Sequence, residues 1–300
     1  MKSFRQKSEG AIRGYDFHKP AVKIGYALMA LVLIVAFLAA VMPLIWVILS
    51  GFKENQEFMR GVKAANKRFY PQFLPVSFNL NGYVDTWKEV KYYRFYLNSL
   101  WVVLGSCVSA VLFNGLLAYV ISRLKPRGSK LVLGLIMLSL MLPATTSLVP
   151  LFINITNLGM IGSFLPLWLS IGANAFYVIL FKSFYDNLPD SLLEAARLDG
   201  CNDLALFYKI VLPLSMPINM VVLIYAVNAA WSDFLLPYLV LTNTPLETVM
   251  VRLFTYRTSD RVNQIDIIKA IVFAIIPPIV LFITFQRQIT QNVVSTGIKG

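Results

Sequence analysis

The chain has 300 residues, of which 57% are hydrophobic and only 14% charged, and its mean hydropathy is +0.66. A soluble globular domain carries about 25% charged residues, so this composition excludes a soluble fold and predicts a polytopic membrane protein. The net charge of +12 does not indicate nucleic-acid binding, because the basic residues lie in short clusters beside apolar runs, where they control topology and contact anionic lipid headgroups.

Six apolar runs are long enough, or nearly so, to cross a hydrocarbon core of about 30 Å as helices. The first has roughly 26 residues, against about 7–15 in the core of a cleaved signal peptide, so we expect it to stay as a membrane anchor. The expected spans are 24–49, 100–121, 131–152, 164–181, 214–240 and 270–285. They predict an all-α membrane protein with a tail at 1–23, a six-helix transmembrane domain at 24–286 and a second tail at 287–300.

Basic residues near the span ends predict the orientation. Those of the first tail are Lys2, Arg5, Lys7, Arg13, Lys19 and Lys23. The tight loop after the second span adds Arg123, Lys125, Arg127 and Lys130, with no acidic residue. An even number of spans places both termini on one side, so both tails, this tight loop and the later loop 184–213 are predicted to be cytoplasmic.

The long outer loop 51–97 is rich in aromatic residues and prolines. They are Tyr70, Pro71, Phe73, Pro75, Phe78, Tyr83 and Trp87. One interpretation is an interfacial aromatic belt with a short helix lying on the membrane. The other is a docking surface for an extracellular partner. The first is favoured, because aromatic belts occur in most membrane proteins.

No catalytic or metal-binding constellation is visible in the sequence. The cysteines are Cys107 and Cys201, without CxxC spacing, and the one histidine is His18 in the polar tail. No glycine is followed directly by lysine, so there is no phosphate-binding loop of the nucleotide-binding type. We therefore expect this chain to bind no cofactor, and any ATP and Mg²⁺ to be bound by a partner subunit.

The loop 184–213 is predicted to form two short helices joined by a tight turn. Ser191 and Glu194 have the spacing of a capping box that would begin the first helix. Gly200 stands where a left-handed C-terminal cap is expected, and Asn202 and Asp203 can cap the second helix. An ordinary amphipathic loop resting on lipid would explain the apolar positions, but it would not explain caps at both joints.

The apolar residues of this loop are expected to form one side of each helix. They are Leu192, Leu193, Ala196 and Leu198 in the first helix, and Leu204, Leu206, Phe207 and Ile210 in the second. The small side chains of Ala195 and Ala196 would leave room for close approach of a partner. The second helix should end at Pro213, where the chain returns to the membrane.

This loop resembles the signature of the permease subunits of bacterial ABC importers, E-A-A, three residues, G, nine residues, I-x-L-P. The matching residues are Glu194, Ala195, Ala196, Gly200, Ile210, Leu212 and Pro213, with Asp199 also present. The resemblance implies that the segment is a coupling helix seated in a cleft of a cytoplasmic ATPase, and that ATP-driven closure of the ATPase dimer moves it. It also implies the type I importer fold.

Further stretches narrow the resemblance to the carbohydrate-type permeases similar to the maltose permease G protein. They are FYLNSLWV (95–102), LAYVISRLK (117–125), MLPATTSLVPLF (141–152), NLGMIGS (157–163), FYDNLPDSLLEAARLDG (184–200), WSDFLLP (231–237) and GIKG (297–300). Ser232 stands where the family often has Asn, and Asn292 and Thr296 stand where it usually has Gly. The resemblance implies a second permease in a heterodimer, an ATPase dimer and an extracellular solute-binding protein.

Asn228, Trp231 and Asp233 are the candidate residues of a substrate pathway. Sugar recognition needs hydrogen-bonding groups beside aromatic faces, and Asp233 is the only acid inside an apolar span, where a charge should face water, a partner or a pore. The simpler alternative is slightly favoured, in which Asp233 makes a subunit or interface contact and Trp231 is an interface anchor. Asn114, Asn174 and Asn219 are expected to bond between helices.

The sequence thus favours a permease subunit of an ATP-driven importer for an oligosaccharide or sugar derivative in the bacterial cytoplasmic membrane, with no enzymatic activity of its own. A secondary carrier driven by an ion gradient is the first alternative. Such carriers often show internal repeats and several ionisable residues inside the membrane, and neither is evident. A membrane-embedded enzyme is weaker still, because the spans hold no paired acids.

Overall fold

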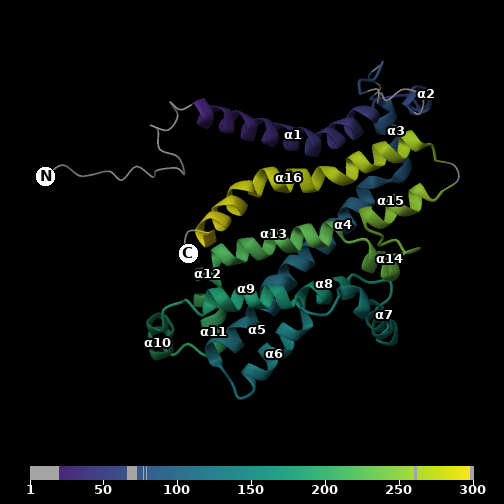
Figure 1. The fold of residues 1–300 in the computed structure, drawn as a ribbon. Helices are drawn as coiled ribbons and strands as arrows, with labels where there is room; N and C mark the ends of the chain where they lie inside the picture. The colour runs from purple at the N-terminus through teal and green to yellow at the C-terminus, as the bar shows by residue number, and fades with distance from the viewer. Residues whose placement is uncertain (1–19, 66–72, 77, 79, 260–261, 298–300) are drawn as a thin grey trace. The chain divides into compact units, whose positions relative to one another are not determined.

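The computed structural model describes residues 20–65, 73–76, 78, 80–259 and 262–297, and within these ranges the chain contains helices and no strand. It divides into two compact units, Met1–Gly82 and Tyr83–Gly300. Figure 1 shows the ribbon with its helix labels. The predicted all-α architecture is confirmed. The segment 1–19, with five of the six basic residues of the first tail, lies outside the described residues.

The first unit holds α1 (Pro20–Ser50) and α2 (Asn55–Ala65). The Trp46 and Phe58 rings lie 6.2 Å apart between these helices. The following loop is held by the main-chain N–H of Val76, which donates to Glu57 Oε1 at 2.8 Å. Tyr70 and Pro71 of the predicted aromatic belt lie outside the described residues.

The second unit holds the remaining helices. In chain order they are α3 (Asn81–Val90), α4 (Tyr92–Ser109), η2 (Ala110–Asn114), α5 (Gly115–Tyr119), η3 (Val120–Leu124), α6 (Ser129–Ser139), η4 (Ala144–Ser147), α7 (Leu148–Asn157), α8 (Leu165–Gly172), α9 (Ala175–Tyr185), α10 (Asp190–Leu198), α11 (Asp203–Leu206), η5 (Phe207–Val211), α12 (Leu212–Leu214), α13 (Met216–Ser232), α14 (Leu235–Leu241), α15 (Val249–Arg257) and α16 (Gln264–Gly297).

Within the described residues, three helices are long and apolar enough to cross a membrane, and the number rises to five if each of two bent helix pairs is one span. The continuous helices are Val22–Ser50, Tyr92–Leu124 and Gln264–Gln286. The bent pairs are Leu165–Gly172 with Ala175–Tyr185, at 43°, and Asp203–Leu214 with Met216–Ser232, at 83°. Four of the six predicted spans therefore correspond to helices or bent helix pairs. The span predicted at 214–240 is divided at Asp233, where the backbone is extended between α13 and α14.

The span predicted at 131–152 is interrupted in the structure. Helix α6 has only 11 residues, and the chain becomes extended at Pro143 (φ −60°, ψ 129°) before the next helical turn begins. Proline has no N–H to continue a helix and disfavours helical geometry in the residue before it. The sequence correctly predicted an apolar run here, but Pro143 divides it between α6 and α7.

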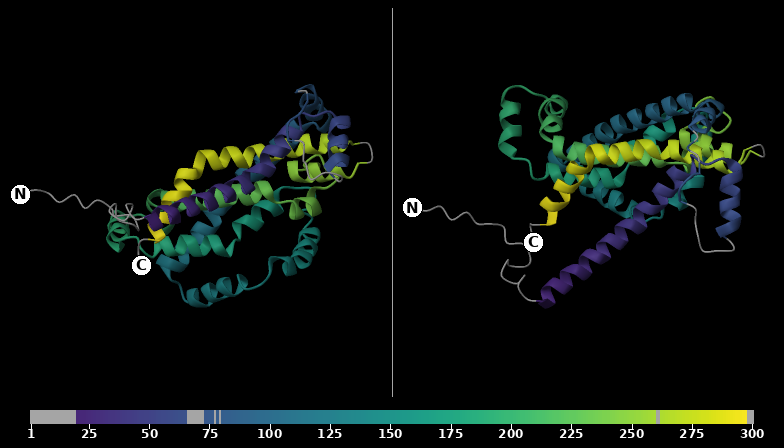
Figure 2. Two further views of the ribbon diagram at one scale, coloured as in Figure 1. Left: turned by 45° about the horizontal axis from the view of Figure 1, so that its top comes forward. Right: turned by 90° about the horizontal axis from the view of Figure 1, so that it is seen from above.

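The second unit is built around α4 and α13, which pack against each other and against the neighbouring helices. In Figure 1, α16, α13 and α9 lie one below another, and α4 and α5 cross them. Figure 2 shows that the segment α10–α11 projects from one end of this bundle. That projecting segment contains the predicted two-helix loop.

Two aromatic residues of the outer loop are half-buried and pack against other rings of the second unit. Trp87 lies 5.5 Å from the Tyr92 ring in a stacked arrangement and 5.0 Å from Phe273. Tyr83 meets Phe273 edge-on at 5.7 Å. Aromatic pairs at such distances add stability beyond the area they bury. Tyr83 and Trp87 thus pack against other aromatic residues of the second unit, and the aromatic belt stays a prediction.

Candidate functional site

Helix α10 carries the first part of the predicted motif and exposes most of it. Leu193 and Ala196 are buried, whereas Glu194 and Ala195 are exposed. Leu198, predicted on the apolar side, is 89% exposed. An exposed leucine among small and acidic residues, on a helix that projects from the bundle, is suited to contact a partner protein.

The predicted capping box at Ser191 is wrong. Helix α10 begins at Asp190, and its N-cap residue Pro189 makes no side-chain cap. Ser191 is therefore inside the first turn, where its hydroxyl cannot accept the capping bond. The first turn contains Asp190, whose carboxylate is held by Arg123 from another helix. A tertiary ion pair thus takes the place of the local cap that the spacing suggested.

The turn after α10 agrees with the prediction. Gly200 has φ +83°, its N–H donates to the Arg197 carbonyl at 3.0 Å, and the N–H of Cys201 donates to the Ala196 carbonyl at 3.0 Å. This pair of bonds is a Schellman motif. A Cβ at position 200 would meet nothing within 4 Å, so glycine is required there by its backbone conformation and not by lack of space.

The second helix of the segment starts at its predicted cap and is anchored in the bundle. Asn202 Oδ1 accepts from the Ala205 N–H at 2.8 Å. Leu206, Phe207 and Val211 are fully buried, and the Phe207 ring lies 5.5 Å from that of Tyr119. Because α10 is mostly exposed and this helix is buried, the second helix ties the projecting segment to the bundle.

The last three motif residues lead into a sharp corner. Ile210 and Leu212 are half-buried, and Pro213 is exposed. After Leu214 the chain turns by 83° into α13. The corner is held by Ser215 Oγ, which donates to the Val211 carbonyl at 2.6 Å, and by Asn219 Nδ2, which donates to the Leu212 carbonyl at 2.9 Å. The motif thus ends where the projecting segment joins a membrane helix.

Asn114 makes the predicted bonds between helices. It lies in the π-helical turn η2 and is fully buried. Its Nδ2 donates to the Ile171 carbonyl at 3.0 Å, and its Oδ1 accepts from the N–H of Asn174 at 2.9 Å. Asn174 in turn caps α9 by accepting from the N–H of Tyr177 at 3.1 Å. One amide therefore holds both sides of the break between α8 and α9.

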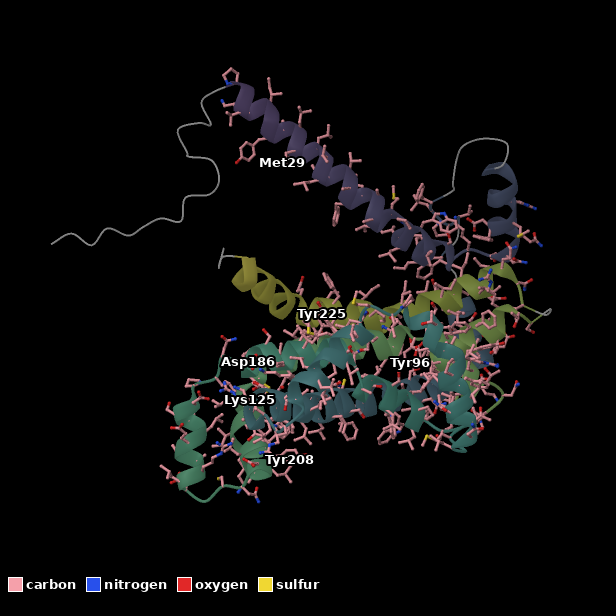
Figure 3. The ribbon with its side chains drawn as sticks, turned by 60° about the horizontal axis from the view of Figure 1, so that its bottom comes forward. Met29, Tyr96, Lys125, Asp186, Tyr208 and Tyr225 are labelled. Atoms are coloured by element: carbon pink, nitrogen blue, oxygen red, sulfur yellow. The ribbon has the colours of Figure 1, made fainter. Side chains whose placement is uncertain are left out.

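The structure separates the three candidate residues of the substrate pathway. Asn228 and Trp231 line a cavity of about 480 Å³ between α13 and α16, but Asn228 is exposed and Trp231 is only 4% exposed. Tyr225, which also lines the cavity, is labelled in Figure 3. Asp233 follows the end of α13, and its carboxylate interacts with the backbone of Leu236 and Leu235 at the start of α14. Asn228 is thus the candidate best placed to meet a solute.

Trp231 has a structural partner that the sequence did not reveal. Its Nε1 donates to the Ala274 carbonyl at 3.1 Å, and the hydroxyl of Tyr96 donates to the Phe273 carbonyl. Pro277 and Pro278 lie four residues after these two carbonyls and have no N–H to offer them. The two aromatic side chains therefore satisfy the carbonyls that the double proline leaves open.

Arg123 is a residue of the site whose role was not inferred from the sequence. It lies in η3, and its guanidinium donates to Asp190 and to the carbonyls of Tyr185 and Leu188. Its neighbour Ser122 donates to Asp186 Oδ1 at 2.5 Å. Figure 3 shows Lys125 and Asp186 together at the end of the bundle from which α10 projects. Only the basic cluster around Arg123 was visible in the sequence.

Comparison with known proteins places this arrangement among transport proteins. Residues 111–295 match the family described as "Binding-protein-dependent transport system inner membrane component". The chain is 28% identical to the diacetylchitobiose uptake system permease protein NgcG of Streptomyces coelicolor, over 84% of this chain and 82% of that one. It is also 28% identical to the arabinooligosaccharides transport system permease protein AraQ of Halalkalibacterium halodurans, over 92% and 95%.

A solved structure has the same fold. It is a chain of a bacterial ABC transporter involved in the import of the acidic polysaccharide alginate. The superposition has a TM-score of 0.77 and covers 90% of this chain and 98% of the other, at 22% sequence identity. At this identity the likeness concerns the fold, which is that of a type I importer permease.

Proposed function

This chain belongs to the family of inner membrane components of binding-protein-dependent transport systems, and we propose that it is a permease subunit through which an ATP-driven importer moves an oligosaccharide or sugar derivative across the membrane. Members of this family are multi-pass inner membrane proteins and transport components, not enzymes. The carbohydrate substrate is supported by the relatives, whose names refer to diacetylchitobiose and arabinooligosaccharides. The secondary carrier finds no support in the family.

The observation that carries the proposal is the exposed face of α10 at the end of a segment anchored in the bundle. Coupling would be carried out by Glu194, Ala195, Ala196, Asp199, Gly200, Ile210, Leu212 and Pro213. Glu194, Ala195 and Asp199 are exposed and would contact the ATPase. The buried Ala196 and the turn at Gly200 would hold the helix in place. Ile210, Leu212 and Pro213 would transmit its movement to α13. Asn228 in the cavity is the proposed contact for the sugar.

The family implies an ATPase and a substrate-binding protein as partners. We further propose that a second, different permease completes a heterodimer, and that ATP and Mg²⁺ bind to the ATPase dimer while this chain binds no cofactor. The basic residues Lys125 and Arg127 lie exposed near the base of α10. They support a cytoplasmic position for this end of the bundle, and with it cytoplasmic termini.

The test uses the complete importer, purified from its native membrane and reconstituted in liposomes. We expect a second permease and an ATPase to co-purify, and uptake of a radiolabelled oligosaccharide mixture to require ATP inside. Glu194→Lys reverses a charge on the exposed face of α10 and should abolish uptake while insertion and expression stay normal. Asp85→Lys, the same type of change at an exposed position of α3, is the control and should transport normally.

Two outcomes would contradict the proposal. A chain that purifies alone and transports without ATP would be a carrier. Normal uptake and normal stimulated hydrolysis in Glu194→Lys would leave the importer in place but remove α10 as its coupling element.

A further inference from the structure

Arg123 occupies a position in which one side chain joins three parts of the chain. Arg123 lies in the last turn of a membrane helix, next to a charged loop, yet its side chain is only 9% exposed. One guanidinium nitrogen lies 2.5 Å from Asp190 Oδ1 in the first turn of α10. The other donates to the carbonyls of Tyr185 and Leu188, at the end of α9 and in the joint that follows it.

The electrostatics of the two helices explain why an arginine suits this position. The last carbonyls of α9 carry the negative end of the helix dipole, which favours a cation. The Tyr185 carbonyl accepts from the N–H of Leu188 at 3.0 Å as well as from Arg123. The first turn of α10 favours an acidic residue, which Asp190 supplies. A planar guanidinium has donors enough to bind both, whereas a lysine ammonium is a single point charge.

A second contact comes from the same helical turn. Ser122 Oγ donates to Asp186 Oδ1, and Asp186 also pairs with Lys182 at 2.6 Å. Both Ser122 and Arg123 lie in η3, the last turn of the continuous helix Tyr92–Leu124. The joint between α9 and α10 is therefore held on one side by the end of this membrane helix.

The other support of α10 is provided by the motif itself. Leu193 and Ala196 pack into the core cluster that also contains Leu206 and Phe207, and Arg197 forms an ion pair with Asp203 of α11 at 3.3 Å. This route leads through α11 and η5 to α13. The same cluster includes Tyr119 and Ile121 of the helix Tyr92–Leu124. The contact through Arg123 adds a polar link from that helix to the first turn of α10.

We propose that Arg123 is a positioning residue that makes α10 and the helix Tyr92–Leu124 move as one body when α10 is displaced. The inference rests on the proposed role of α10 as the coupling helix. It assigns a second route for that movement, formed by a side chain outside the motif. Without the guanidinium, the first turn of α10 would lose its ion pair with Tyr92–Leu124, while the apolar packing of Leu193 and Ala196 would remain.

The experiment measures a spin-label distance in the complete importer in liposomes. Labels are placed at Ser191→Cys on α10 and Lys125→Cys at the end of the membrane helix, both exposed positions, with Cys107 and Cys201 replaced by serine. Spectra are recorded without nucleotide and after trapping with ATP and vanadate. In the Arg123 parent we expect one narrow distance that trapping does not change.

Arg123→Gln should lose this signature, giving a broad distribution that shifts on trapping. Arg123→Lys keeps the ion pair with Asp190 but not both carbonyl contacts, and should be intermediate. Arg127→Gln removes the same charge from an exposed position in the same loop and should match the parent. Asp190→Asn, which keeps Arg123 and its carbonyl bonds, should broaden the distribution even if Arg123→Gln fails to assemble.

Each result has one meaning. A narrow, unchanged distance in Arg123→Gln or in Asp190→Asn would overturn the proposal. A parent complex that lacks ATP hydrolysis would contradict the proposed function instead, because the importer itself would then be absent.

Discussion

The indole Nε1 of Trp231 lies 3.1 Å from the main-chain carbonyl oxygen of Ala274, 43 residues further along the chain. That carbonyl would have no donor of its own, because Pro278 stands where the next helical N–H is expected. Membrane helices tolerate proline when neighbouring groups satisfy the freed carbonyls. Here Trp231 and Tyr96 do so for two consecutive carbonyls of α16.

We expect Trp231→Phe to destabilise the permease by about 1 kcal/mol, since a buried carbonyl loses its partner and bonds of this kind between membrane helices contribute roughly 0.6–2 kcal/mol. The measurement is the thermal unfolding midpoint of the complex in detergent. Trp101→Phe alters a tryptophan that is 60% exposed on α4 and should leave the midpoint unchanged. Equal shifts in both variants would contradict the role of the indole N–H.

Gly200→Ala should destabilise the projecting segment by about 1–2 kcal/mol, because an alanine is strained at a positive φ. Gly200→Asn should cost much less, since asparagine tolerates that conformation. Limited proteolysis between α10 and α11 measures the effect. Gly134→Ala is the matched control in α6, where a Cβ also meets nothing within 4 Å. If alanine and asparagine at position 200 behave alike, backbone strain is not the reason for glycine.

Asn114→Leu should open the break between α8 and α9. The substitution leaves the Ile171 carbonyl and the Asn174 N–H without partners, at a cost of about 1–3 kcal/mol for each buried group. Hydrogen exchange at Asn174 should become faster, and mass spectrometry of the peptide around it would detect this. Asn154→Leu, at an exposed position of α7, should have no effect there. Unchanged exchange in Asn114→Leu would show that packing alone holds the break.

Asp186 makes the contact between η3 and α9 dependent on pH. Burial opposes the charged carboxylate, but hydrogen bonds from Lys182 and Ser122 and the charges of Lys182 and Arg123 outweigh it and lower the pKa of Asp186. A lowered pKa stabilises the folded state above the ordinary carboxyl pKa of about 4, and this stabilisation is lost as pH falls through the lowered value. Asp186→Asn should therefore unfold at a lower temperature than the parent at pH 7.

The difference between Asp186→Asn and the parent should shrink as the pH falls below about 4 and through the lowered pKa of Asp186, because the carboxyl is then protonated and both side chains are uncharged. Asp190→Asn is a useful comparison, because its ion pair with Arg123 is separate from the pair between Lys182 and Asp186. A difference that stays constant from neutral to acid pH would exclude the carboxylate charge as its cause.

The local caps of the projecting segment illustrate how far the sequence could be read. The left-handed turn at Gly200 and the cap at Asn202 were both predicted, because each depends on residues within a few positions of one another. The cap at Ser191 was predicted on the same grounds and failed. There the deciding contact came from Arg123, 67 positions before Asp190, and no local spacing could indicate it.

The sequence by itself determined the membrane class, the approximate place of the apolar runs and the motif of the projecting segment. These depend on hydropathy, helix length and short-range capping, which are properties of neighbouring residues. Only the tertiary structure decided that Trp231 donates to the Ala274 carbonyl, that Trp87 stacks on Tyr92 and that Arg123 binds Asp190 of α10. Each of these depends on a donor or ring meeting a partner from a distant part of the chain, and such a meeting is set by how the helices pack.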